Sequence, residues 1–435
     1  MKNKVLIGLL LVLIGGWGNL LAQKAGESYA RQVNTLIGTK GVGLTSGYLY
    51  PGATYPYGMV QFTPSYFSKR SGFVINQLSG GGCEHMGNFP TFPVKGKLKM
   101  SPDNILNYRI NISEEKGHAG YYEAMVQEDI KAKLTVTERT GMASYEYPAD
   151  QQYGTVIIGG GISATPIEQA AVVITAPNKC EGYAEGGNFC GLRTPYKVYF
   201  VAEFDTDALE LGTWKRDDLK PNTTFAEGEY SGVYFTFDVS KKKNIQYKIG
   251  VSYVSVENAR ENLKAENAGW DFLQIQNQAE SKWNHYLGKI EVEGSNPDRT
   301  TQFYTHLYRS FIHPNVCSDV NGEYMGADFK VHKSRSKHYT SFSNWDTYRT
   351  QIQLLAMLDP EVASDIVISH QLFAEEAGGA YPRWVMANIE TGVMQGDPTP
   401  ILISNAYAFG ARNYDPKPIF KIMRKGAEEP GAMSQ

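Results

Sequence analysis

The hydrophobic pattern of this chain changes its period near Val256, and this change limits the folds that the chain can adopt. From about residue 45 to residue 255, short runs rich in β-branched and aromatic residues are separated by turn residues. In one run, Tyr196, Val198 and Phe200 alternate with outward-facing neighbours, which is typical of a strand with one buried face. Many short strands at this spacing favour a β-sandwich or a β-barrel.

Helix-favouring sequence begins at residue 256. Residues 256–297 are rich in charged residues, and Trp270, Phe272 and Trp283 can serve as packing anchors. We interpret this segment as a helical linker.

Helices are also predicted for most of residues 298–435. Asp359, Asp397 and Asp415 each precede a proline, so each carboxylate can cap a helix whose first turn suits that proline. About five helices fit in this region, one of them over residues 360–377. The long loops between them should carry the chemistry.

Residues 1–22 are predicted to be a secretory signal peptide. Lys2 and Lys4 precede an apolar run, and the small residue Ala22 follows it. We therefore expect an exported protein, either periplasmic or extracellular. No later stretch approaches the roughly 20 apolar residues of a membrane span. The chain has 42 Lys and Arg against 45 Asp and Glu, so it lacks the positive field that nucleic acid binding requires.

In an oxidising compartment, Cys180 and Cys190 could form a disulfide around the short segment between them. Two free thiols are the alternative. No pattern in the sequence connects Cys83 with Cys317.

Three clusters of glycine, aromatic and charged residues are candidates for function. In the first, a run of three glycines precedes Cys83, Glu84 and His85 and lets the backbone approach a ligand closely. The alternative is a tight crossover between strands, with no ligand.

The second cluster contains Trp345, Asp346 and Arg349. An indole ring can stack on a sugar while a carboxylate accepts hydrogen bonds from vicinal hydroxyls, so this cluster suits a glycan. The structural alternative is that Asp346 caps a helix and pairs with Arg349 one turn later.

In the third cluster, Trp384 could line the same cleft, while Glu390 and Asp397 are weak candidates for a catalytic acid and base. His85, His306 and His313 lack the spacing of metal ligands to one another, and each is expected to be a structural or surface residue.

The sequence resembles glycoside hydrolase family ninety-two, the calcium-dependent exo-α-mannosidases. The matching segments follow the family order over nearly the whole chain: residues 33–39, 51–64, 78–83, 120–141, 339–360 and 381–410. The resemblance implies an antiparallel β-sandwich over residues 23–255, the linker over 256–297, and an incomplete (α/α)6 toroid over 298–435.

The resemblance also implies a function. Family enzymes remove terminal α-linked mannose from glycans with inversion, using a Glu as acid, an Asp as base and calcium to hold the sugar. By position, Asp346 would grip the sugar, supported by Trp345 and Arg349, and the loop with Cys83, Glu84 and His85 would complete the pocket. The acid, the base and the calcium ligands are expected beyond Gln435.

We therefore expect this chain to be a fragment, since twelve toroid helices need on the order of 300 residues. Two alternatives stay open. One is a non-catalytic protein that binds glycans. The other is a different sandwich-plus-toroid glycosidase or a polysaccharide lyase.

Overall fold

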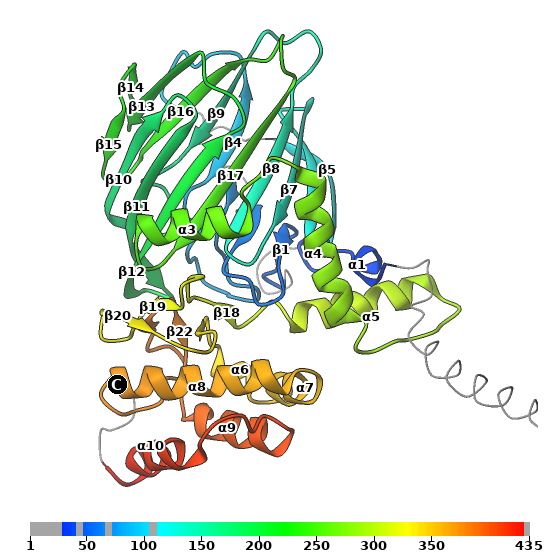
Figure 1. The fold of residues 1–435 in the computed structure, drawn as a ribbon, viewed down its shortest axis with the longest axis vertical. Coiled ribbons are helices and arrows are strands. Elements are labelled where there is room, and N and C mark those ends of the chain that lie inside the picture. Colours follow the sequence, from blue (N-terminus) through cyan, green and yellow to red (C-terminus); the bar gives the residue numbers. More distant parts are fainter. Residues whose placement is uncertain (1–27, 41–46, 66–71, 104–110, 430–435) are drawn as a thin grey trace, which may run out of the picture.

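The computed structural model describes residues 28–40, 47–65, 72–103 and 111–429. The signal peptide predicted for residues 1–22 lies outside these described residues. Strands make up most of the described residues up to Ser252, and helices dominate the described residues from Val256 onward (Figure 1).

The strands form two large antiparallel sheets. Within the described residues, the first sheet has eight strands in the order β1 (Ala53–Thr54), β2 (Gln61–Pro64), β3 (Phe73–Val74), β4 (Thr91–Lys95), β9 (Tyr153–Ile158), β16 (Ser231–Asp238), β13 (Glu210–Lys215) and β14 (Asp218–Pro221). The second sheet, counted over the same residues, has nine in the order β15 (Phe225–Glu227), β10 (Ile167–Ala176), β11 (Lys179–Phe189), β12 (Leu192–Phe204), β17 (Asn244–Ser252), β8 (Thr140–Glu146), β7 (Ile130–Val136), β6 (Tyr121–Val126) and β5 (Ile112–His118).

The core lies between the two sheets, so the fold is the predicted antiparallel β-sandwich. In β12, Tyr196, Val198 and Phe200 are buried while the residues between them are only partly buried, which confirms the predicted period of two. Phe204 of the second sheet packs against Phe235 of the first, with 4.9 Å between ring centroids. Such contacts between facing sheets exclude water from the core and supply most of the stability of a sandwich.

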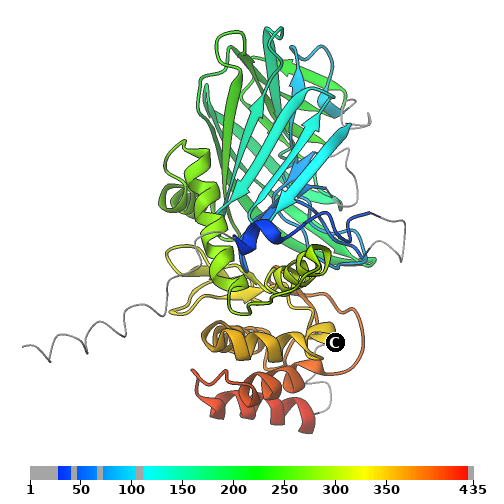
Figure 2. The same cartoon turned by 90° about the vertical axis from the view of Figure 1, so that its right-hand side faces the viewer.

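Two long helices follow the sandwich and pack against its side (Figure 2). The first is α3 (Val256–Glu266), and Ser255 caps it by accepting a hydrogen bond from Asn258 N–H at 3.0 Å. The second is α4 (Phe272–Leu287), which buries Trp283; its indole N–H donates to Thr54 O at 2.6 Å. A short helix, α1 (Tyr29–Gln32), packs beside α4.

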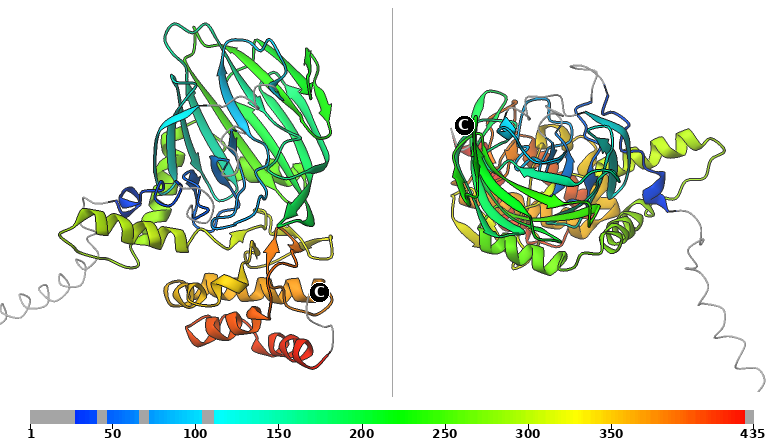
Figure 3. Two further views of the ribbon diagram at one scale, coloured as in Figure 1. Left: turned by 180° about the vertical axis from the view of Figure 1, so that it is seen from behind. Right: turned by 90° about the horizontal axis from the view of Figure 1, so that it is seen from above.

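The remaining elements lie at one end of the sandwich (Figure 3). Small strands and helices of this part are β18 (Asn315–Val316), β19 (Glu323–Met325), β20 (Val331–Lys333), β21 (Tyr339–Thr340), α6 (Asn344–Thr347), β22 (Val385–Met386) and β23 (Ile389–Glu390). The longer helices are α5 (Pro297–Ser310), α7 (Gln351–Leu358), α8 (Pro360–Glu376), α9 (Pro398–Ala408) and α10 (Pro416–Glu428).

Helix α8 covers almost the same residues as the predicted helix over 360–377. Asp359 and Asp415 cap α8 and α10 through backbone N–H groups, as predicted. Asp397 occupies the corresponding position before α9, but its side chain makes no capping hydrogen bond. The predicted cap at Asp397 is therefore wrong.

A buried cluster of charges joins the sandwich to the segments that follow it. Arg139, in the turn between β7 and β8, contacts Glu138 at 2.6 Å and Glu266 of α3 at 2.7 Å. Its Nε–H also donates to Ser318 O at 2.7 Å, beyond α5. Because both carboxylates and the guanidinium are satisfied, this cluster fixes the two parts against each other.

The disulfide predicted between Cys180 and Cys190 is wrong. Cys190 is bonded to Cys83, while Cys180 and Cys317 are buried free thiols. Cys180 lies at the start of β11 and Cys190 directly follows its end. Ten residues of extended strand span about 33 Å, far beyond the reach of a disulfide.

None of the helices within the described residues is both long enough and apolar enough to cross a membrane.

Candidate functional site

Helix α6 carries an exposed carboxylate among the predicted site residues. Asp346 is exposed, and its carboxylate accepts a hydrogen bond from Ser343 Oγ. Its neighbour Asn344 is fully buried and donates to Thr399 Oγ1 at 2.7 Å and to His370 Nε2 at 2.9 Å. Because these buried bonds hold the helix from beneath, the carboxylate of Asp346 is fixed at the surface, free to accept hydrogen bonds from a ligand.

Trp345 and Arg349 lie beside Asp346. The Arg349 guanidinium sits 5.1 Å from the centre of the Trp345 ring and 4.8 Å from that of Tyr348. Among the described contacts Arg349 makes no ion pair with Asp346, and the helix cap position belongs to Ser343. The structural alternative of a capping Asp346 paired with Arg349 is therefore wrong, and both charged groups face solvent.

Trp384 is almost completely buried, with 6% of its surface exposed. Its ring packs on Phe189 at the end of β11, with 4.5 Å between centroids, and its backbone pairs with Ser343. Trp384 therefore supports the site from behind, since little of its ring is open to a ligand.

The loop that follows the glycine run is held tightly at both ends. Cys83 is tied to Cys190 by the disulfide, and His85 is buried. Leu78 N–H donates to His85 Nε2 at 2.8 Å, so His85 Nδ1–H donates to Cys83 O at 2.7 Å. Burial lowers the pKa of His85 to about 4, so the ring is neutral at pH 7. Glu84, in contrast, is exposed.

A continuous path of contacts connects the three predicted clusters. The Cys83–Cys190 bond reaches the end of β11, where Phe189 touches both the His85 ring and Trp384. From Trp384 the backbone pairing leads to the segment carrying Asp346. The structure thus brings four segments together where the sandwich meets the helices: those around Cys83, Cys190, Trp345 and Trp384.

Glu390 and Asp397 have different surroundings, and no described contact joins their carboxyl groups. Glu390 accepts backbone N–H groups of Arg383 at 2.6 Å, Trp384 at 3.2 Å and Gly392 at 3.0 Å, so it organises the hairpin of β22 and β23. Burial raises the pKa of Asp397, while Arg383 lowers it in part. We assign neither residue to proton transfer.

Two residues that position the site were not among the sequence-based candidates. Arg383 donates from Nε to Gly396 O and from Nη1 to Met394 O, both at 2.8 Å, and so shapes the loop before α9. His313 accepts from Ser79 N–H at 2.7 Å and thereby links the glycine run to the segment after α5. The residue types alone do not reveal these roles, because the partners are backbone groups: 11 and 13 residues away for Arg383, and 234 residues away for His313.

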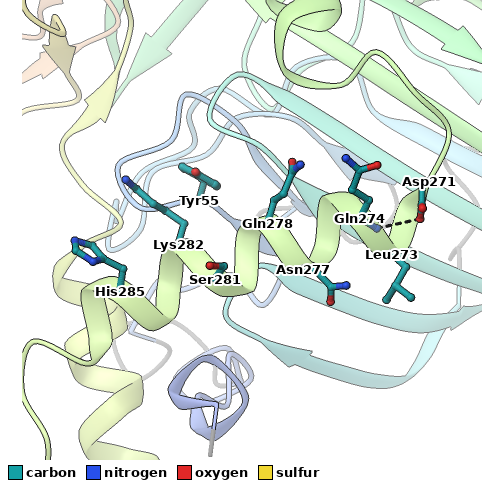
Figure 4. Close-up of a pocket in the computed structure, with 9 residues that line it drawn as sticks. All are labelled: Tyr55, Asp271, Leu273, Gln274, Asn277, Gln278, Ser281, Lys282 and His285. Atoms are coloured by element: carbon teal, nitrogen blue, oxygen red, sulfur yellow. Dashed lines mark hydrogen bonds between the residues drawn. The ribbon is translucent and has the colours of Figure 1, made fainter. Parts of the chain in front are cut away.

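A separate shallow groove of about 740 Å³ runs along α4 (Figure 4). Amide, hydroxyl and charged side chains of this helix line it together with one tyrosine from the sandwich: Tyr55, Asp271, Leu273, Gln274, Asn277, Gln278, Ser281, Lys282 and His285. It contains none of the residues predicted to bind substrate.

The fold and the junction site define a two-part protein, an antiparallel sandwich joined to a helical region, with side chains at the junction of the kind that bind sugars. Residues 32–252 match the glycosyl hydrolase family 92 N-terminal domain, and residues 258–435 match the glycosyl hydrolase family 92 catalytic domain. The chain belongs to glycosyl hydrolase family 92.

Solved structures support this assignment. The structure of a family 92 α-mannosidase from Bacteroides thetaiotaomicron matches with a TM-score of 0.85 at 25% sequence identity, over 93% of this chain and 57% of that chain. The structure of the same enzyme in complex with mannoimidazole gives the same score and identity, over 93% of this chain and 56% of that one.

A curated relative, named an uncharacterized secreted glycosidase, comes from Arthroderma benhamiae. It is 26% identical over 74% of this chain and 45% of the relative. This chain therefore spans about half the length of the proteins that it matches.

Proposed function

We propose that this protein is an exported α-mannosidase that removes terminal α-linked mannose from glycans with inversion. The observation that carries the proposal is the exposed carboxylate of Asp346, held by Ser343 beside Trp345 and Arg349 at the junction of the two parts. The solved relative that is named an α-mannosidase and binds mannoimidazole supports mannose as the sugar. The relative named a secreted glycosidase supports export.

The described residues of the site bind and orient the sugar in this proposal. Asp346 accepts hydrogen bonds from two neighbouring hydroxyls of a terminal mannose, which fixes the rotation of the ring. Trp345 and Arg349 flank Asp346. Glu84 is exposed on the loop whose neighbour Cys83 is bonded to Cys190, and we propose that it contributes to the site from the sandwich. Inversion requires two further carboxyl groups about 6.5–9.5 Å apart with a water between them, and we assign none of the described residues to those roles.

Calcium is proposed as the cofactor on the basis of the family resemblance. Calcium binds six to eight oxygen atoms. The one group of potential metal ligands that the described residues contain is Asp328, His332 and Glu376, which includes an imidazole and offers too few oxygens. These residues therefore do not fit calcium, and we derive no step through it.

Hydrolysis of mannobiose tests the proposal. The protein is incubated with α-1,2-, α-1,3- and α-1,6-linked mannobiose, with calcium and after chelation, and the first sugar released is followed by NMR. From protein that also supplies the acid and the base, which we assign to none of the described residues, we expect β-mannose as the initial product, as inversion of an α-mannoside requires, and no release from α-glucosides. Release of α-mannose first would contradict the inverting mechanism.

A second candidate is a protein that binds glycans without cleaving them. Two observations favour it. Trp345, Asp346 and Arg349 form an ordered candidate site for sugar, and the carboxylate of Glu390 accepts hydrogen bonds from backbone N–H groups. Saturable binding of methyl α-mannoside with no turnover of any mannobiose would support this candidate.

A further inference from the structure

Three potential metal ligands converge where the hairpin of β19 and β20 meets the C-terminal end of α8. Asp328 and His332 come from the hairpin and Glu376 from the last turn of the helix. One donor atom of each lies within 4.8 Å of the other two, and all three side chains are partly buried. None of them belongs to the site around Asp346.

The chain holds these groups in place before any ion binds. His332 Nε2 lies 2.9 Å from Asp328 Oδ1. Glu376 accepts hydrogen bonds from Tyr324 O–H at 2.6 Å and from Ala327 N–H at 3.0 Å, so its carboxylate is fixed toward the hairpin. Groups that are oriented in advance lose little entropy on binding an ion.

A glycine makes the convergence possible. A Cβ atom on Gly326 would lie 2.6 Å from His332 Cδ2, 2.8 Å from Asp328 Oδ1 and 2.8 Å from Glu376 Oε2. Any side chain at this position would therefore occupy the space at which the three ligands meet. The Gly326 carbonyl accepts from Asn388 Nδ2 at 3.0 Å, which fixes the glycine against the turn between β22 and β23.

We propose that Asp328, His332 and Glu376 bind a divalent ion of the zinc class. One imidazole and two carboxylates are ligands that Zn²⁺ accepts, and a water can complete a tetrahedral shell. Metal–ligand bonds of about 2.0–2.2 Å place the ligand atoms of such a shell about 3.3 Å apart. His332 Nε2 and Asp328 Oδ1 are already 2.9 Å apart, and a ligand atom of Glu376 lies within 4.8 Å of the ligand atoms of both residues. Small side-chain rotations therefore suffice to form the shell.

The ion would take the place of the proton between His332 Nε2 and Asp328 Oδ1; that proton would pass to solvent, and the neutral ring would carry its proton on Nδ1. Lys330, whose Nζ lies 3.4 Å from Asp328 Oδ2, is 77% exposed at its side chain and can turn toward solvent. Binding ties the hairpin to the end of α8, so the site acts as a structural clamp below the sandwich. This role does not depend on the proposed glycan hydrolysis.

Titration of the metal-free full chain with ZnCl₂ tests the proposal, by calorimetry and by thermal unfolding. We expect one Zn²⁺ per chain and a higher Tm on binding. His332→Ala and Glu376→Gln should each weaken binding at least tenfold, and Gly326→Ala should weaken it too. His285→Ala, at an exposed histidine on α4, is the matched control and should bind as the unaltered chain does.

X-ray absorption on the unaltered chain with one equivalent of Zn²⁺ gives a test that needs no variant. One imidazole with oxygen ligands is expected. A shell with sulfur or with two or more imidazoles would overturn the proposal. So would the absence of saturable binding, or equal affinity in His332→Ala and the unaltered chain.

Discussion

Phe189 and Trp384 pack ring against ring, with centroids 4.5 Å apart, across the junction between the sandwich and the helices. Phe189 ends β11, one residue before the disulfide-bonded Cys190, and Trp384 directly precedes β22. This contact links the covalently fixed loop of the sandwich to Trp384, whose backbone pairs with Ser343 directly before the helix that carries Asp346.

Loss of the Trp384 ring should destabilise the protein. Trp384→Ala removes a large buried side chain and leaves a cavity against Phe189, so we expect a loss of about 3–5 kcal/mol in the free energy of unfolding. Phe420→Ala, at an aromatic residue of α10 that is 61% exposed, should change it by no more than about 0.5 kcal/mol. Urea denaturation measures both, and equal effects would contradict the packing role of Trp384.

Asp346→Asn should weaken sugar binding and leave the fold intact. The amide keeps the size of the side chain, but it loses the charge that strengthens hydrogen bonds from sugar hydroxyls, so affinity for methyl α-mannoside should fall about tenfold or more. Because Asp346 is exposed, Tm should stay within about 1 °C of the unaltered value. Calorimetry and thermal unfolding check the two expectations, and unchanged affinity would exclude Asp346 from the site.

Stability should fall in acid through Glu280 on α4. Burial alone would raise the pKa of Glu280, but hydrogen bonds from His118, Gln276 and Arg31 outweigh it and lower the pKa to about 2. Since this pKa lies below the ordinary value of 4.5, the stabilisation is complete above about pH 4.5 and is lost as pH falls toward 2. Urea denaturation at several pH values gives the free energy of unfolding. Between pH 6 and pH 2.5 this free energy should fall less for Glu280→Gln than for the unaltered chain.

The Cys83–Cys190 bond should be the disulfide found by peptide mapping, and its removal should lower stability. It closes a loop of 107 residues, for which the entropic effect is about 4–5 kcal/mol. We expect the double variant Cys83→Ala, Cys190→Ala to lose roughly 2–5 kcal/mol, and its Tm should no longer respond to a reductant.

Cys180→Ala provides the control for this disulfide. Its thiol is buried and free, so the variant should keep both the bond and its sensitivity to reduction. If peptide mapping instead found a disulfide between Cys180 and Cys190, the Cys83–Cys190 pairing would be contradicted.

The sequence was sufficient for features that depend on near neighbours in the chain. Alternation in β12 predicted which side chains are buried, because a strand turns successive residues to opposite faces. Asp359 and Asp415 predicted the starts of α8 and α10, because a cap and its partner N–H lie within one turn. Trp345, Asp346 and Arg349 could also be named as candidates from their residue types, and their role in binding sugar stays a prediction.

Only the tertiary structure decided which distant residues meet. Cys190 pairs with Cys83 because strand β11 separates it from Cys180, and the fold brings residue 83 beside the end of this strand. Glu390, by its type a candidate acid, instead accepts three backbone N–H groups. Asp328 and His332 lie four residues apart, a spacing that could have drawn attention, but Glu376 joins them only through the docking of a hairpin on α8. Local patterns fix which face each element buries, whereas contacts between elements depend on how all those faces pack together.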